Sequence, residues 1–298
     1  MIKSFYNVRP VYQKETMTSS RTARLTVIVM AFNLVLTLVG LVQLLLMVRN
    51  SSYYGEMNYS SLLRMYTLVA SFEAAFLLFI VPALTAGSIS GERERQTLDL
   101  LLCTRLRPID IIIGKLLSCL STVFVLIISS LPVLSLVYIY GGIGLKDLGA
   151  LFVCLVVTTL FTGSISIFFS ALMKKTTMAT VLSYLTVVFL VAGTYMVLTL
   201  TYHFCTLTAS DVLKPETGLY PWNLLLLVNP AMTFYSLFNQ QIGSFEEMNF
   251  MTWFNSYIMT DHLKESWWIG CSCLLQTALS AVFIWLASYV ISPLRRKD

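Results

Sequence analysis

Residues 25–48 read LTVIVMAFNLVLTLVGLVQLLLMV, an apolar run without a single charged residue. An α-helix rises 1.5 Å per residue, so about 20 apolar residues cross the hydrocarbon core of a bilayer. The run is long enough to do this, and it predicts a membrane-spanning helix.

Five more apolar blocks follow along the chain, at 62–86, 111–140, 148–173, 178–203 and 267–291. Hydrophobic residues make up 57% of the chain, and its mean hydropathy is +0.76. Charged residues make up 12%, against about 25% in a soluble domain, and they cluster between the blocks. This composition excludes a soluble enzyme, a disordered tail and a nucleic-acid-binding protein. It predicts an all-α membrane protein with six spans.

Three of the apolar regions contain proline, one of them being block 62–86 with Pro82. Pro132 lies inside block 111–140 and predicts either a kink or the point where that helix leaves the membrane core. Residues 219–238 are apolar enough to enter the bilayer, but Pro221 and the Asn229–Pro230 pair break any continuous helix there. We interpret 219–238 as a re-entrant or interfacial segment.

The distribution of Lys and Arg predicts the orientation of the spans. If residues 1–24 are cytosolic, fifteen of the 20 Lys and Arg residues fall on cytosolic segments and five on outer ones. We therefore expect a multi-pass protein of the cell membrane with both ends, 1–24 and 292–298, in the cytosol and the long loop 204–266 outside. Four tryptophans then fall on the outer side, where indole rings suit the lipid headgroups: Trp222, Trp253, Trp267 and Trp268.

The six cysteines lack the spacing of a disulfide scaffold or a zinc site. Cys205 lies in the outer loop, and Cys271 and Cys273 lie near the start of the last block. Two interpretations remain: a bridge from Cys205 to one of the other two, or unreactive buried thiols.

Motifs of catalysis are missing from the sequence. It has two His residues and no H-E-x-x-H, no G-x-S-x-G and no G-x-x-x-x-G-K-[ST]. We therefore expect that the chain is not an enzyme, holds no metal and binds no cofactor directly. Any use of ATP then needs a second polypeptide with its own P-loop.

Residues 87–110, GSISGERERQTLDLLLCTRLRPID, join spans two and three. Leu98, Leu101, Leu102 and Leu106 share one face of a helix, which Pro108 ends. This pattern predicts a short amphipathic helix at the cytosolic surface. Its leucine face suits either lipid headgroups or a protein partner.

This segment resembles the signature of type-2 ATP-binding-cassette (ABC) transporter permeases. In that family an E-R-E-x-G-T-[LM]-[ED]-x-L-L segment joins spans two and three, and a G-K pair opens span three. Here the corresponding residues are 92–102 and Gly114–Lys115, with Gln96 where the family has glycine. Residues 9–15, RPVYQKE, are similar to the N-terminal interface helix of such permeases.

The resemblance implies the permease subunit of an ATP-driven exporter. Two permeases, identical copies or paralogues, pair around a path for an exported substrate, and each receives an ABC ATPase subunit that holds ATP and Mg. The segment between spans two and three is the coupling helix that contacts the ATPase. The residues that the resemblance assigns to this contact are Glu92, Arg93, Glu94, Thr97, Leu98, Leu101 and Leu102. The long outer loop caps the path.

Glu73 is the only acidic residue deep within a span. A charged carboxylate there is costly, so we expect it to face a polar cavity, find a partner or carry a proton. It either lines the translocation path or links helices by a hydrogen bond.

Three other classes of function compete with the exporter. An ATP-independent secondary transporter predicts broken helices in matched halves, whereas Pro82 and Pro132 lie in neighbouring spans. A membrane-embedded enzyme lacks its motifs. A membrane protein that recruits a cytosolic partner through the amphipathic helix remains an alternative.

Overall fold

The computed structural model describes residues 12, 23–54, 59–98, 103, 107–139, 143–197, 200, 225–242 and 266–292. Within these residues nearly all of the chain is helical and no strand occurs, which confirms the predicted all-α class. Six helices are long and apolar enough to cross a membrane, as predicted. Four lie within α2 (Ala23–Tyr54), α6 (Pro108–Ile139), α7 (Leu145–Leu172) and α12 (Ser266–Ile291), and a fifth, Leu62–Glu94, comprises most of α3 (Tyr59–Thr85) and the short helix that follows it.

The remaining span begins as α8 (Thr176–Val188), widens into the π-helical turn η1 (Phe189–Gly193) and continues to Val197. Two short helices complete the description, α4 (Ser90–Glu94) and α10 (Pro230–Ile242). The predicted interface helix 1–24 and tail 292–298 lie almost entirely outside the described residues, whereas residues 225–242 of the predicted outer loop 204–266 are described and contain α10.

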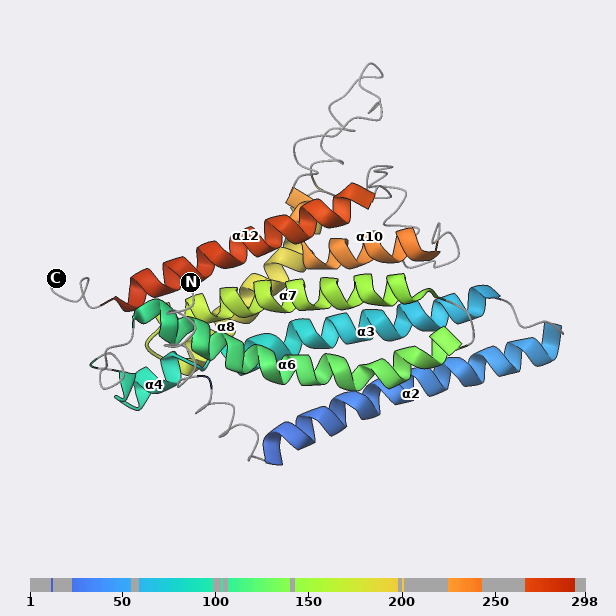
Figure 1. Ribbon diagram of the computed structural model, residues 1–298, viewed down its shortest axis with the longest axis horizontal. Helices are drawn as coiled ribbons and strands as arrows, with labels where there is room; N and C mark the ends of the chain where they lie inside the picture. The colour runs from blue at the N-terminus through green and yellow to red at the C-terminus, as the bar shows by residue number, and fades with distance from the viewer. Residues whose placement is uncertain are drawn as a thin grey trace, which may run out of the picture. The chain divides into compact units, whose positions relative to one another are not determined.

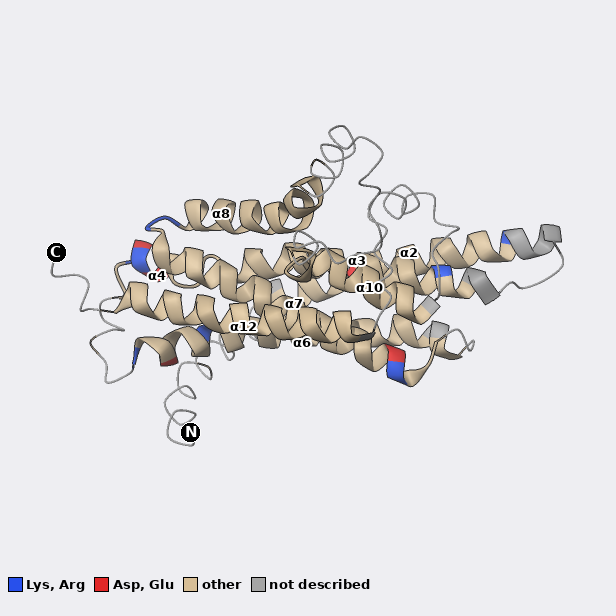
Figure 2. Ribbon diagram, turned by 90° about the horizontal axis from the view of Figure 1, so that it is seen from above, with Lys and Arg blue, Asp and Glu red and all other residues tan. Residues whose placement is uncertain are grey.

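The chain divides into two compact units, Met1–Tyr184 with Thr277–Asp298, and Leu185–Gln276. In the first unit α2 packs against α3 and α6, and α7 packs against the same pair (Figure 1). Helix α6 continues through Pro132 to Ile139. Most charged residues of these helices gather at the two ends of the bundle (Figure 2), which is what a bundle with an apolar membrane zone requires.

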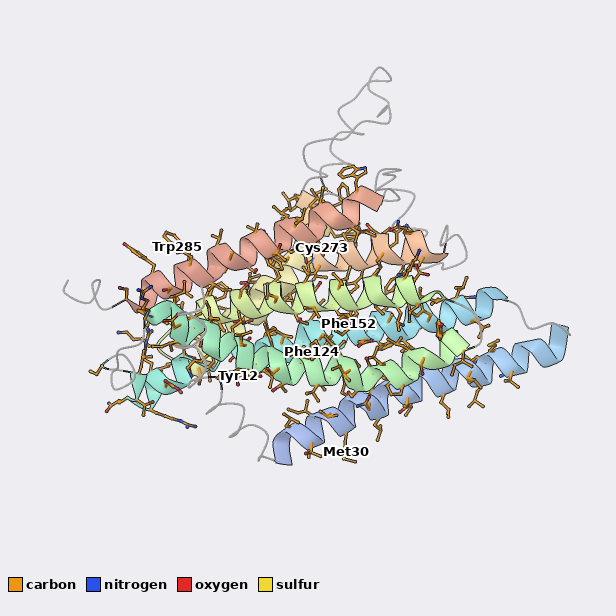
Figure 3. All side chains as sticks on the ribbon, viewed as in Figure 1. Tyr12, Met30, Phe124, Phe152, Cys273 and Trp285 are labelled. Atoms are coloured by element: carbon orange, nitrogen blue, oxygen red, sulfur yellow. The ribbon has the colours of Figure 1, made fainter. Side chains whose placement is uncertain are left out.

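Small and aromatic residues set the contacts inside the first unit. A Cβ on Gly163 of α7 would lie 3.2 Å from Leu116 of α6 and 3.6 Å from Val81 of α3, so the glycine lets three helices approach closely. Phe124 and Phe152 pack edge to face between α6 and α7, with ring centroids 5.6 Å apart (Figure 3).

The outer surface of the helices is apolar. Met30 on α2 is 67% exposed and Trp285 on α12 is 61% exposed, and both point away from the helices that carry them (Figure 3). Side chains of this kind would be unfavourable in water and suit contact with lipid.

The second unit is built around α10. Leu226, Leu227, Met232 and Tyr235 pack with Trp268 at the start of α12. Trp267 is 41% exposed and its headgroup position stays a prediction, whereas Trp268 is fully buried, so its ring does not lie among headgroups as expected. Its large ring is the centre of this small core.

Candidate functional site

The chain leaves α3 at Thr85, turns, and forms the five-residue helix α4. The helix starts against α7, because Ser170 Oγ accepts hydrogen bonds from the N–H groups of Ile89 (2.9 Å) and Ser90 (3.0 Å). The first N–H groups of a helix have no partner within the helix. A side chain 80 residues away in the sequence therefore caps α4 and joins it to α7.

Helix α4 ends in a Schellman motif. The Thr97 N–H donates to the Glu92 carbonyl (2.9 Å) and the Gln96 N–H donates to the Arg93 carbonyl (3.1 Å), which is the hydrogen-bond pattern of that motif. Gln96 has a φ of 58°, a left-handed conformation in which glycine is usual and other residues are strained. The permease signature has glycine at this position, and the backbone shows why.

This geometry interrupts the predicted amphipathic helix. Helix α4 ends at Glu94 because the left-handed residue stops it, and the backbone is helical again at Leu98. Leu98 is only 5% exposed and packs in a core cluster with Ile89, Ile112 and Leu116. Its burial argues against Leu98 as an anchor on a partner's surface. Leu101, Leu102 and Leu106 lie outside the described residues.

Replacing Gln96 by glycine is expected to stabilise this turn. A non-glycine residue in the left-handed conformation costs about 1–2 kcal/mol of folding free energy. Glycine removes this strain, but it also raises the conformational entropy of the unfolded chain, which cancels part of the gain. Amide hydrogen exchange at residues 96 and 97 should slow about threefold to fivefold in Gln96→Gly and speed up in Gln96→Val. Arg95→Gly is the matched control, since Arg95 has a φ of −81° and gains nothing from glycine. Equal slowing in both glycine variants would contradict strain at Gln96.

An ion pair joins the two halves of the permease signature. Lys115 Nζ on α6 lies 2.8 Å from Glu92 Oε1 on α4, and it also donates to the Ser88 carbonyl at 2.8 Å. The Lys115 side chain is 3% exposed and that of Glu92 is 26% exposed. Water screens such a pair little, so it holds α4 firmly to the start of α6.

Two further contacts tie α4 to the turn between α7 and α8, residues 173–176. Arg93 Nη1 donates to the Met173 carbonyl at 3.1 Å. The Glu94 carboxylate accepts from Thr176, at 2.9 Å from its backbone N–H and 3.0 Å from its hydroxyl. Three charged residues of the signature thus bond to two places in the bundle, Glu92 to α6 and both Arg93 and Glu94 to the 173–176 turn. Thr97 stays at the surface.

Glu73 lies in the middle of α3 and has an exposed fraction of 0%. Its Oε1 lies 2.5 Å from Ser130 Oγ of α6. Its Oε2 is buried and has no hydrogen-bond partner among the described residues. The expected partner is therefore present for one of the two oxygens, and the other oxygen has unused bonding capacity.

In the second unit Asn229 divides the apolar segment 219–238, as predicted. Residues 225–227 form a 3₁₀ turn and α10 starts at Pro230. The Asn229 side chain accepts from the Ala231 N–H (2.9 Å) and donates to Thr194 Oγ1 (2.8 Å) and the Val191 carbonyl (3.1 Å). It thus caps α10 and fastens it to the π-helical turn.

A second polar cluster links α10 to α12. Thr233 and Ser272 hydroxyls lie 2.6 Å apart, and Gln276 Nε2 donates to Thr233 at 2.9 Å. On the same helix Cys271 forms no disulfide with a described residue, and Cys205 lies outside them. The described residues contain no group of three His, Cys, Asp or Glu side chains able to hold a metal.

Sequence reasoning found the charged residues of the site, and it missed the bonds of the Asn229 side chain and most of the hydroxyl residues. Ser170, Thr176, Ser130 and Asn229 each bond across helices. The available signal was a Ser, Thr or Asn in or beside a span, since lipid offers such a side chain no hydrogen bond. The signal does not name the partner.

The fold and this site define a polytopic helical membrane protein whose connecting segment between the second and third spans is bonded into the end of the bundle. The profile of the ABC-2 family transporter proteins matches residues 9–293. The chain belongs to this family and is a transmembrane permease of an ABC transporter. No curated protein compared with the chain matches it.

Proposed function

We propose that the chain is the permease subunit of an ATP-driven exporter and that residues 87–110 form its coupling segment for a separate ABC ATPase subunit in the cytosol. The observation that supports this most is the set of bonds that joins α4 to three helices. Glu92 bonds to α6, Glu94 bonds to the first residue of α8, and Ser170 of α7 holds the start of α4. A force on α4 is therefore passed to α6, α7 and α8 together.

The surface offered to the ATPase is the polar side of the segment. Glu94, Arg95, Gln96 and Thr97 are exposed, whereas Leu98 belongs to the bundle core. Glu92 and Arg93 orient the segment rather than forming its contact surface. Leu101 and Leu102 stay proposed as the apolar part of the contact, since interfaces combine a polar rim with apolar anchors.

The N-terminal segment is proposed to lie along the cytosolic face of the membrane. Tyr12, the one residue of 9–15 that the structure describes, has its hydroxyl 3.0 Å from Ser121 Oγ of α6. A second permease, an identical copy or a paralogue, completes the path. ATP and Mg are bound by the ATPase subunits, and both ends of the chain are cytosolic.

Glu73 is proposed as a residue of the translocation path. A buried carboxylate oxygen without a hydrogen-bond partner is energetically costly within the membrane. Ionisable residues at this depth are typical of substrate or ion pathways. The alternative is that the bond to Ser130 only links α3 to α6.

The experiment is reconstitution of the purified chain in proteoliposomes with the ATPase chain that co-purifies with it, identified by its P-loop sequence. The transport probe is the dye that the wild-type pair moves fastest from a panel of amphipathic fluorescent dyes. We expect ATP-dependent dye movement that stops when the P-loop lysine of the ATPase is replaced by alanine. Movement driven by a proton or sodium gradient without ATP would instead establish a secondary transporter. Absence of any co-purifying ATPase would refute the exporter.

A further inference from the structure

We propose that Glu73 holds a proton in this structure and gives it up when the bundle takes a cationic amphipathic cargo, so that one positive charge replaces another at the same carboxyl group. The inference rests on the proposed function, in which Glu73 belongs to the translocation path. It adds the chemical class of the cargo, an organic cation with an apolar body.

The proton follows from the number of hydrogens available between Glu73 and α6. Ser130 Oγ lies 2.5 Å from Glu73 Oε1 and 2.7 Å from the Ile127 carbonyl oxygen. A hydroxyl group has one hydrogen, and a backbone carbonyl can only accept. With an ionised Glu73, both neighbours would have to share that single hydrogen. With a protonated Glu73, the carboxyl group donates to Ser130 and Ser130 donates to Ile127, so each contact has its own hydrogen.

The neighbouring Ser129 has the same arrangement with a partner whose role is fixed. Its hydroxyl donates to the backbone carbonyl three residues earlier at 2.7 Å and accepts from Asn33 Nδ2 of α2 at 2.9 Å. An amide nitrogen can only donate, and Asn33 Nδ2 also lies 3.0 Å from the Val29 carbonyl, which identifies it as the nitrogen. Ser130 repeats this pattern with Glu73 in the place of the donor.

The surroundings of Glu73 also suit a neutral acid. Its exposed fraction is 0%, and it forms no ion pair in the part of the chain that the structure describes. Helices α2, α6 and α7 pack against α3. The charged residues of these three helices are Arg24, Arg49, Asp110, Lys115, Lys146 and Asp147, and their thiols are Cys119 and Cys154. A proton on Glu73 avoids burial of a charge without a partner.

Two phenylalanines beside this polar cluster indicate the kind of cation. Phe76 lies one helical turn after Glu73 on α3, and its ring meets Phe32 of α2 edge to face, with ring centroids 6.2 Å apart. Phe32 directly precedes Asn33 in the chain. Aromatic faces attract organic cations, whereas the described residues offer no group of three His, Cys, Asp or Glu side chains for a metal ion. An organic cation therefore fits the site.

The exchange is one proton transfer in each direction. When cargo enters, the O–H bond of the Glu73 carboxyl group breaks, its proton passes to water, and the carboxylate pairs with the cation. When cargo leaves, the carboxylate takes a proton from water and the O–H bond forms again. The carboxyl group is neutralised in both states, which avoids the cost of an unpaired charge within the membrane. An anionic cargo would find no such compensation.

The test is made on the purified full-length permease alone, without its ATPase. Infrared spectra at neutral pH compare wild type with Glu73→Gln, which cannot ionise, and with Asp147→Asn, which removes a carboxyl group in the first turn of α7. Ser130→Ala is the fourth protein. The probes are tetraphenylphosphonium and tetraphenylborate, which have nearly the same shape and opposite charge. Their Kd values and the protons released on binding are measured in weakly buffered solution.

We expect a carboxylic-acid C=O band in wild type and in Asp147→Asn that is absent from Glu73→Gln. In Ser130→Ala the band should remain and shift, because the acid has lost its acceptor. Tetraphenylphosphonium should release about one proton per wild-type chain, and its binding should tighten about tenfold per pH unit as the pH rises, since protons compete with it. It should bind Glu73→Gln about tenfold more weakly.

Three results would overturn the inference: no acid band that depends on Glu73, binding of tetraphenylphosphonium without proton release, or equal affinity for tetraphenylborate. ATP-dependent dye movement in the proteoliposomes would still establish the exporter in each of these cases. Proton release by tetraphenylphosphonium without any ATP-driven transport would instead refute the exporter and identify Glu73 as the exchange site of a secondary transporter.

Discussion

Replacing Lys115 by methionine is expected to lower ATP-driven transport about 100-fold while leaving the chain inserted in the membrane. The substitution leaves Glu92 and the Ser88 carbonyl without the Nζ that lies 2.8 Å from each. Removing one partner of a buried ion pair costs about 3–5 kcal/mol. Because Glu92 is 26% exposed, we take the lower end of that range, which corresponds to a factor of about 100. Helix α4 then no longer moves with α6.

The measurement is dye transport and ATP hydrolysis by the reconstituted permease and its ATPase. Lys146→Met is the control, since it removes an exposed lysine in the first turn of α7, a different helix from the α6 that carries Lys115. The double variant Lys115→Met/Glu92→Met should recover thermal stability because no buried charge is left alone. It should not recover coupling fully, because the directional contact is gone. Wild-type transport by Lys115→Met would show that the ion pair has no part in coupling.

Glu73→Gln is expected to lower dye transport about 10- to 100-fold without changing assembly with the ATPase. Glutamine has the shape of glutamate and keeps an oxygen for Ser130, which lies 2.5 Å from Glu73 Oε1. The change replaces Oε2, the atom without a partner among the described residues, by an amide. A hydrogen bond to a charged group contributes about 1.5–3 kcal/mol, which sets the size of the loss if cargo or an accompanying ion uses that oxygen.

Ser130→Ala separates the two roles of Glu73. It removes the bond between α3 and α6 and leaves the carboxylate in place. A role in the path predicts that Ser130→Ala keeps most of the transport, whereas a linking role predicts that it lowers thermal stability and transport as much as Glu73→Gln does. Full transport by Glu73→Gln would make Glu73 a packing residue.

The limits of sequence prediction are clearest at the coupling segment. The sequence placed it correctly between the second and third spans and singled out Glu92, Glu94 and Lys115 as parts of a signature. It predicted one unbroken amphipathic helix up to Pro108, whereas α4 ends at Glu94 and helical backbone resumes at Leu98. The reason is backbone geometry at Gln96, whose φ of 58° is rare for a residue with a side chain. Amphipathic periodicity carries no signal for such a turn.

Leu98 shows the same limit for side chains. Its place on an apolar face is evident from the sequence, but an apolar face packs equally well on a partner or within its own chain. In the structure it packs against Ile112 and Ala171, from two other helices. Only the position of those helices distinguishes the two outcomes.

The sequence alone determined which segments are membrane helices. Each such helix satisfies its own backbone hydrogen bonds, and its apolar length must match the bilayer, so both conditions are local in the chain. The tertiary structure decided which polar side chains meet: Lys115 with Glu92, Ser170 with the start of α4, Asn229 with the π-helical turn. These pairs depend on the depth and rotation of each helix. Apolar helices pack against one another and against lipid with similar energies, so the hydrophobic pattern that predicts the spans does not fix that depth or rotation.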